Sequence, residues 1–148
     1  MKVLIQRVEK AGVNIEGKDI STIKKGILAL VGIEKGDTKE QVEKLAGKVV
    51  KLRIFPDEND KMNLSLLDIQ GEMLVVSQFT LCGDCKKGTR PSFDKSAPPD
   101  IANELYVIED MGIDSLVIWQ ASDGKLYQSV NGKNFSTIPI SFAEYINE

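Results

Sequence analysis

Apolar and polar residues alternate along much of the chain, a pattern typical of strands that bury one face. The segment 2–8, KVLIQRV, is a clear example. The segment 26–33, GILALVGI, is nearly all apolar and predicts a central strand that is buried on both faces. Further strands are predicted at 12–16, 19–23, 52–55, 72–80, 115–119, 125–130 and 135–142, with hairpin turns at Asp123-Gly124 and Asn131-Gly132.

Two segments have helical periodicity instead. Thr38 and Gln41 have the spacing of a capping box, and the apolar residues behind them fall on one face, which predicts a helix over 38–51. Pro98-Pro99 predicts the start of a second helix, which Gly112 ends. Many antiparallel strands with two helices indicate a single α+β domain over residues 1–148.

Composition narrows the possible roles. A chain of 148 residues is long enough to bury one core, and its net charge of −3 argues against a strongly basic nucleic-acid binder. No apolar run approaches the roughly 20 residues that span a bilayer, and the N-terminus has no signal-peptide core, so we expect a cytoplasmic protein. Lys86, Lys87 and Arg90 form a local basic cluster that can contact phosphates or, alternatively, be an ordinary solvated loop.

The chain contains no histidine. Nucleophilic mechanisms that rely on an imidazole base are therefore excluded, as are zinc sites built on histidine. Cys82 and Cys85 have the CxxC spacing of a redox pair or half a zinc knuckle, but two sulfurs cannot hold a metal alone. Gly83-Asp84 favours a turn between them, so incidental thiols are the preferred interpretation and redox chemistry the weaker one.

The segment VVSQFTL at 75–81 leads an apolar strand into polar residues, and the basic segment KKGTRPSF follows at 86–93. These motifs, with MKVLIQRVEKAGV, GILALVGIEKGDT and KLRIFPDENDKMNLSLLDI, occur in order over residues 1–106. Together they resemble the D-aminoacyl-tRNA deacylase (D-tyrosyl-tRNA deacylase) family.

The resemblance implies a small β-rich, barrel-like fold with two helices, acting as a homodimer without a cofactor or metal. It implies hydrolysis of the ester that joins a D-amino acid, or glycine, to the 3′ end of tRNA, which is chiral proofreading. The expected partners are the aminoacyl-tRNA 3′ end and a second copy of the chain, with no membrane and no DNA. The residues that match are catalytic Ser77, Gln78, Phe79 and Thr80, and substrate-binding Met62, Ser65, Lys86, Lys87 and Arg90.

The resemblance leaves two mechanisms open. Thr80 acts as the nucleophile, or the 2′-OH of the terminal adenosine helps to activate water. We favour the second, because a threonine hydroxyl without an adjacent base stays protonated and the chain has no histidine. In a strand, Phe79 would face away from Gln78 and Thr80, so we expect the motif to act through backbone N–H groups that stabilise the oxyanion.

The C-terminal third departs from the family pattern. The family carries a Gly-Pro element that reaches the partner's active site and rejects L-amino acids, whereas this chain has no Gly-Pro dipeptide. The nearest counterpart is Ile138-Pro139, an X–Pro bond that can adopt the cis form. A divergent tail and a frame-shifted tail both fit the pattern. The alternative function is a non-catalytic relative that binds tRNA ends.

Overall fold

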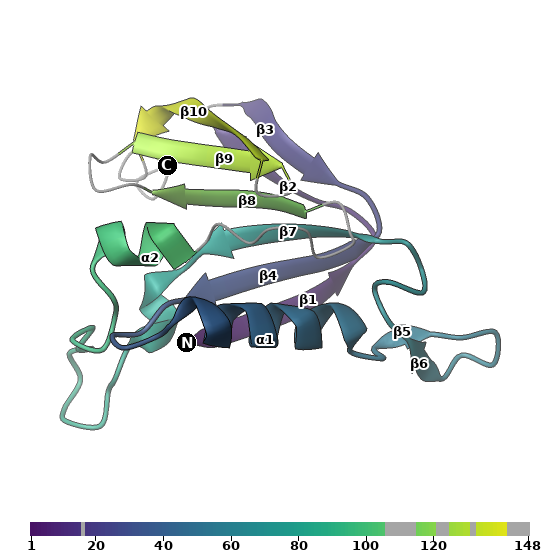
Figure 1. Cartoon of the computed structure of the whole chain (residues 1–148), viewed down its shortest axis with the longest axis horizontal. Helices are drawn as coiled ribbons and strands as arrows, with labels where there is room; N and C mark the ends of the chain where they lie inside the picture. The colour runs from purple at the N-terminus through teal and green to yellow at the C-terminus, as the bar shows by residue number, and fades with distance from the viewer. Residues whose placement is uncertain (16, 106–114, 121–124, 131–132, 142–148) are drawn as a thin grey trace.

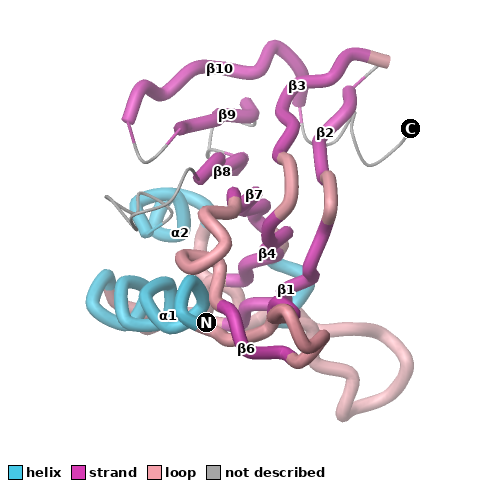
Figure 2. The backbone as a smooth tube through the Cα atoms, turned by 90° about the vertical axis from the view of Figure 1, so that its right-hand side faces the viewer, coloured by secondary structure: helices cyan, strands magenta, loops and turns pink. Residues whose placement is uncertain are grey.

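The structure, a computed structural model, describes residues 1–15, 17–105, 115–120, 125–130 and 133–141. Its centre is a six-stranded sheet with two helices packed against one face (Figures 1 and 2). In spatial order the strands are β1 (Lys2–Val8), β4 (Gly26–Gly32), β7 (Glu72–Ser77), β8 (Ser115–Gln120), β9 (Lys125–Val130) and β10 (Lys133–Ser141).

The predicted α+β class with two helices is confirmed, but the sheet is mixed rather than antiparallel throughout. β4 pairs with β7 in parallel, and β7 pairs with β8 in parallel. Within the described residues the sheet is open, with β1 and β10 as its edges, so the expected barrel-like closure is not seen there.

Helix α1 (Lys39–Lys51) covers the part of the sheet formed by β1, β4 and β7 (Figure 1). Its predicted capping box is confirmed: the Gln41 backbone N–H donates to Thr38 Oγ1 at 3.4 Å, and the Thr38 N–H donates to Gln41 Oε1 at 3.0 Å. The helix buries Val42, Val49 and Val50. They pack with residues of the facing strands into one core, and the β4 and β7 members of that core are Ile27, Ala29, Val31, Met73 and Val75.

Two small hairpins flank this core. β2 (Ala11–Ile15) and β3 (Lys18–Ile23) pair on the side of the sheet opposite the helices (Figure 2). β5 (Phe55–Pro56) and β6 (Met62–Leu64) project from one end (Figure 1). The turn between β5 and β6 is held by Asp57, whose pKa is lowered because its carboxylate accepts the backbone N–H groups of Lys61 and Asn59.

The second helix, α2 (Pro99–Leu105), begins where the proline pair predicts, and its expected continuation to Gly112 lies outside the described residues. The predicted strands near 115–142 are confirmed as β8, β9 and β10, while their two hairpin turns also lie outside. β10 is an edge strand, where a proline is tolerated. All described peptide bonds are trans, so the cis form considered for Ile138–Pro139 is not present.

No helix in the described part of the chain is both long and apolar enough to cross a membrane.

The contact between β4 and β7 depends on Gly26. A Cβ at this position would lie 1.8 Å from the backbone oxygen of Glu72, far inside van der Waals contact. Gly47, within α1, has no atom within 4 Å of such a Cβ. The same substitution should therefore have opposite effects at the two glycines.

We expect Gly26→Ala to destabilise the protein by about 2–3 kcal/mol, because the parallel strands must separate. Gly47→Ala should stabilise it by about 0.5–1 kcal/mol through higher helix propensity. Urea unfolding of both variants measures these free energies. Equal stability of the two variants would contradict the close approach of β4 and β7.

Candidate active site

The segment 77–82 forms a tight turn at the end of β7 rather than a longer strand. β7 ends at Ser77, and the residues that follow form η1 (Phe79–Cys82), one turn of 3₁₀ helix. The predicted strand over 72–80 is therefore wrong at its last three residues. Because side chains alternate only in a strand, the prediction that Phe79 faces away from Gln78 and Thr80 does not apply.

Gly32, the last residue of β4, is the support on which η1 rests. A Cβ here would lie 3.0 Å from Cys82 Sγ and 3.1 Å from the Gln78 carbonyl oxygen, so a side chain would displace the turn. The Gln78 N–H donates to the Val31 carbonyl at 2.7 Å, and the fully buried Cys82 thiol donates to the Ile33 carbonyl at 3.7 Å. These contacts fix the backbone of η1 against the core.

Thr80 has a neighbour that cannot act as a base. The Gln78 side-chain amide donates to Thr80 Oγ1. A carboxamide has no basic site near neutral pH, and among the described residues no other side chain hydrogen bonds to this hydroxyl. As a nucleophile, Thr80 would therefore keep its proton.

Two adjacent backbone amides are available in the same turn. Across the described residues, no acceptor pairs with the N–H groups of Phe79 and Thr80, while the Leu81 N–H donates to the Gln78 carbonyl at 3.2 Å. Both residues are exposed. Adjacent backbone amides without acceptors in the protein are groups that can stabilise an oxyanion.

Phe79 forms an exposed aromatic pair with Phe93. The ring centroids lie 5.4 Å apart at 70°, an edge-to-face contact. Phe79 is 49% exposed and Phe93 is 37% exposed. The Phe79 carbonyl also accepts the Ser96 hydroxyl at 3.2 Å, which holds the returning chain against η1.

Lys86, Lys87 and Arg90 lie on an exposed hairpin that begins directly after η1. Paired backbone hydrogen bonds of 2.8 and 2.9 Å between Asp84 and Ser92 close this loop, and Gly88 adopts a φ of +80° within it. We call residues 84–92 the basic hairpin. The three predicted cations therefore lie on one exposed loop that follows η1 in the chain.

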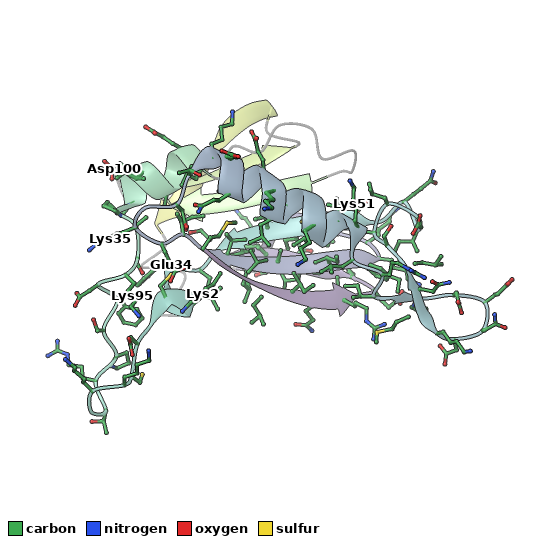
Figure 3. The ribbon with its side chains drawn as sticks, turned by 60° about the horizontal axis from the view of Figure 1, so that its bottom comes forward. Lys2, Glu34, Lys35, Lys51, Lys95 and Asp100 are labelled. Atoms are coloured by element: carbon green, nitrogen blue, oxygen red, sulfur yellow. The ribbon has the colours of Figure 1, made fainter. Side chains whose placement is uncertain are left out.

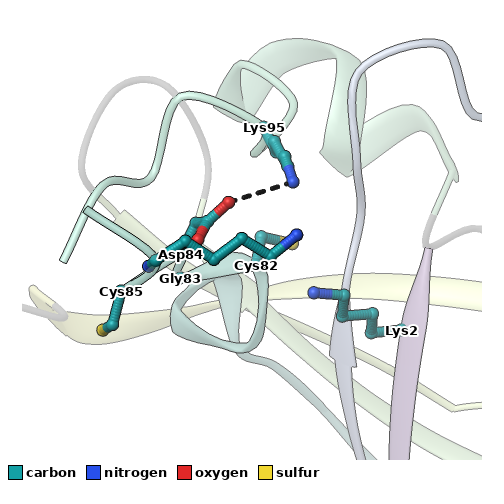
Figure 4. Close-up of a pocket in the computed structure, with 7 residues that line it drawn as sticks. Lys2, Cys82, Gly83, Asp84, Cys85 and Lys95 are labelled. Carbon is teal, nitrogen blue, oxygen red and sulfur yellow. Dashed lines mark hydrogen bonds and ion pairs between the residues drawn. The ribbon is translucent and has the colours of Figure 1, made fainter.

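A cavity of about 400 Å³ separates the basic hairpin from the edge strand β1 (Figure 4). Asp84 organises one wall. Its carboxylate accepts the Lys86 backbone N–H at 2.9 Å and pairs with Lys95 Nζ at 3.2 Å, and both contacts lower its pKa. The lining residues are Lys2, Cys82, Gly83, Asp84, Cys85, Lys86 and Lys95.

Sequence reasoning assigned no role to Lys2, Lys95 or Phe93. Phe93 belongs to the KKGTRPSF motif, which was a signal of its proximity to the site. Lys2 had no such signal, because only the fold brings β1 beside residues 82–95. Figure 3 shows Lys2 and Lys95 at the same end of the sheet, with Lys51 at the other end.

The other predicted residues lie apart from η1. Met62, on β6, and Ser65 precede the start of β7, whereas η1 follows its end (Figure 1). Met62 is 67% exposed. Ser65 is buried, and its hydroxyl donates to Asp68 Oδ2 at 2.8 Å while accepting the Asp68 N–H at 3.1 Å. Ser65 thus shapes the turn before β7.

Ile138 and Pro139 lie on β10, at the far edge of the sheet from β1. Ile138 pairs with Leu126, and the register shifts between Ile138 and Ser141. The backbone of one chain therefore does not bring this dipeptide to the β1 edge where the cavity lies. Throughout the described residues, no group of three potential metal-ligating side chains of His, Cys, Asp or Glu occurs.

Comparisons with known proteins match the part of the chain that carries the motifs of the deacylase family. The family model described as D-Tyr-tRNA(Tyr) deacylase matches residues 4–111. A D-aminoacyl-tRNA deacylase of Thermosipho africanus is 60% identical over 106 residues, which cover 72% of this chain and 71% of the relative. One of Thermodesulfovibrio yellowstonii is 61% identical over 106 residues, covering 72% and 73%.

Solved structures share the fold. The c-Myc DNA unwinding element binding protein is 41% identical, with a TM-score of 0.67 over 72% of this chain and 71% of that one. A probable eukaryotic D-amino acid tRNA deacylase is 21% identical, with a TM-score of 0.57 over 71% and 62%. The family match ends at residue 111, so the departing C-terminal residues 112–148 lie outside it.

The two cysteines differ sharply in accessibility, since Cys82 is buried, Cys85 is exposed and both are free. We expect a disulfide-exchange reagent to label one thiol of the native protein rapidly and the second only after unfolding. Cys85→Ser should abolish the rapid phase, because the buried Cys82 thiol cannot reach the reagent. Rapid labelling of both thiols, or of neither, would contradict this arrangement and revive a redox role for the pair.

Proposed function

Since the chain belongs to the D-Tyr-tRNA(Tyr) deacylase family, we propose that it hydrolyses the ester between a D-amino acid, or glycine, and the 3′ end of tRNA. This activity removes the wrong amino acid from mischarged tRNA before translation. The observation that carries the proposal is η1, where two adjacent amides without acceptors among the described residues lie beside the basic hairpin. The proposed location is the cytoplasm.

The chemistry that fits this turn is attack by water on the ester carbonyl. The N–H groups of Phe79 and Thr80 stabilise the oxyanion that forms, and the 3′-oxygen of the terminal ribose leaves with a proton. Because the only side chain among the described residues that hydrogen bonds to the Thr80 hydroxyl is an amide, the neighbouring 2′-OH of the ribose assists the proton transfers. The products are the free amino acid and tRNA.

The side chains of the motif then position the substrate. Gln78 fixes the Thr80 hydroxyl, and Phe79 with Phe93 supplies an apolar wall beside the amides. Lys86, Lys87 and Arg90 bind the acceptor stem through its phosphates. Met62 lies beyond the opposite end of β7, so a contribution from it requires a second copy of the chain.

One face of the sheet exposes apolar side chains that a second copy of the chain could cover. The sheet face opposite α1 carries Leu4 on the edge strand β1, and Leu4 pairs with Leu30, which in turn pairs with Val76. Leu4 is 56% exposed, and Leu30 and Val76 are only half-buried. A row of apolar side chains on an edge of a sheet favours association. We therefore propose a homodimer through this face.

Binding of nucleic acid without hydrolysis is the second candidate function. The basic hairpin favours it, and so does the similarity to the c-Myc DNA unwinding element binding protein, which is 41% identical. The net charge of −3 limits such binding to a local patch. This candidate predicts salt-dependent binding without turnover.

Deacylation of D-Tyr-tRNA, with L-Tyr-tRNA as the matched substrate, tests the proposed function. We expect release of D-tyrosine at least about 10²-fold above the rate without enzyme, from oxyanion stabilisation. Binding of D-Tyr-tRNA without release would favour the second candidate function. Equal release from both substrates would show that discrimination was lost with the Gly-Pro element.

The mass of the protein in solution tests the dimer. Sedimentation should give twice the chain mass of 16.3 kDa, and Leu4→Glu should give the single mass because it places a charge in the apolar row. Ile101→Glu is the matched control, since Ile101 is 49% exposed on α2, which packs on the opposite side of the sheet. If the unchanged protein sedimented with the mass of one chain, the dimer would be excluded.

A further inference from the structure

The cavity between β1 and the basic hairpin is lined by Lys2 and Lys95, to which the proposed hydrolysis assigns no role. Its volume of about 400 Å³ is in the range of sites for small ligands. Its lining contains three lysines, Lys2, Lys86 and Lys95, and one carboxylate, that of Asp84. The lining therefore carries a net charge of +2, which favours an anion.

The two lysines at the sides of the cavity are directed into it. Figure 4 shows the side chains of Lys2 and Lys95 extending from different elements into the same space. Asp84 holds Lys95 Nζ at 3.2 Å, and the low pKa of Asp84 keeps this contact ionised in mildly acidic solution. Lys2 Nζ lies 4.0 Å from Glu34, whose carboxylate already binds the Met1 amine at 2.6 Å. The long contact leaves the Lys2 amine able to bind a ligand without breaking a close ion pair.

An aromatic surface adjoins the cavity at Gly83. A Cβ on Gly83 would lie 3.1 Å from Phe93 Cε1, so the Phe93 ring packs directly on this lining residue. Phe93 is also part of the exposed pair with Phe79. A cationic cavity beside an exposed ring matches the two parts of a nucleotide, because phosphates bind ammonium groups and bases stack on aromatic rings.

We propose that the cavity is a phosphate subsite for the RNA strand that leads to the 3′ end. Lys2, Lys86 and Lys95 neutralise one backbone phosphate, and the neighbouring base stacks on Phe93. The subsite rests on the proposed function and deepens it. Because the cavity lining begins at Cys82, where η1 ends, a strand anchored there presents its terminal ester to the amides of Phe79 and Thr80.

The test is the binding of an RNA minihelix that ends in CCA and carries no amino acid. Binding to the full chain is measured by fluorescence anisotropy. We expect the double variant Lys2→Gln, Lys95→Gln to bind about tenfold more weakly. The slope of log K against log salt concentration should become smaller by about 1. The matched control is Lys44→Gln with Lys61→Gln, which makes the same change in net charge on α1 and on the turn before β6. This control should bind as the unchanged protein does.

Neutral methylphosphonate linkages, placed one at a time in the CCA end, locate the contact. One linkage should weaken binding to the unchanged protein and have no effect on the Lys2→Gln, Lys95→Gln variant. Lys2→Gln alone repeats the test without touching the Lys95–Asp84 pair that stabilises the hairpin. Equal binding by the lysine and control variants, or a linkage effect that persists in the lysine variant, would overturn the subsite.

Free phosphate is the competing source of the same chemistry. Millimolar inorganic phosphate at constant ionic strength should not displace the minihelix, since the proposed ligand includes a stacked base. Displacement would assign the cavity to free phosphate and overturn the RNA proposal. Because the minihelix carries no amino acid, failure of the subsite is distinguishable from failure of hydrolysis, which the D-Tyr-tRNA measurement tests separately.

Discussion

The parallel pairing of β4 with β7 is the constraint on which the rest of the structure depends. β4 begins at Gly26 and ends at Gly32, and both glycines lie where another backbone or a turn approaches too closely for a side chain. Gly26 lets the strands meet at one end, and Gly32 lets η1 fold over the other end. The α1 core covers the same pair of strands, so the turn lies against the buried core of the protein.

This support explains how a chain without histidine can present a hydrolytic site. The Gln78 N–H and the Cys82 thiol fix η1 to the residues that end β4, and the amides of Phe79 and Thr80 remain without acceptors in the described part of the chain. A preorganised pair of amides lowers the barrier without moving, and an ester is an easy target. The basic hairpin follows η1 directly in the chain, and the proposed phosphate contacts lie on this hairpin and in the cavity that it forms with β1.

Much of the fold could be predicted from the sequence, because local signals and packing agree in it. The Thr38–Gln41 capping box predicts the start of α1. The alternation of apolar and polar residues predicts both ends of β1 correctly. No glycine or proline directly follows Ser77 to mark the end of β7, so the predicted strand continued through Thr80. Gly32, which leaves room for the turn, lies 45 residues before Ser77 in the chain. Lys2 likewise joins the cavity only through tertiary pairing. The resemblance predicts a catalytic role for residues 77–80. The expectation that their backbone acts came from the absent histidine and from a strand alternation that η1 replaces.

In the proposed mechanism the backbone N–H groups of Phe79 and Thr80 stabilise the oxyanion, and the 2′-OH of the terminal adenosine assists the proton transfers. The most direct test compares D-Tyr-tRNA ending in adenosine with the same substrate ending in 2′-deoxyadenosine. The account predicts a fall of about 10²-fold or more with the deoxy substrate, and less than about tenfold for Thr80→Val on the natural substrate. Unchanged cleavage of the deoxy substrate, together with loss of activity in Thr80→Val, would contradict it and make Thr80 the nucleophile.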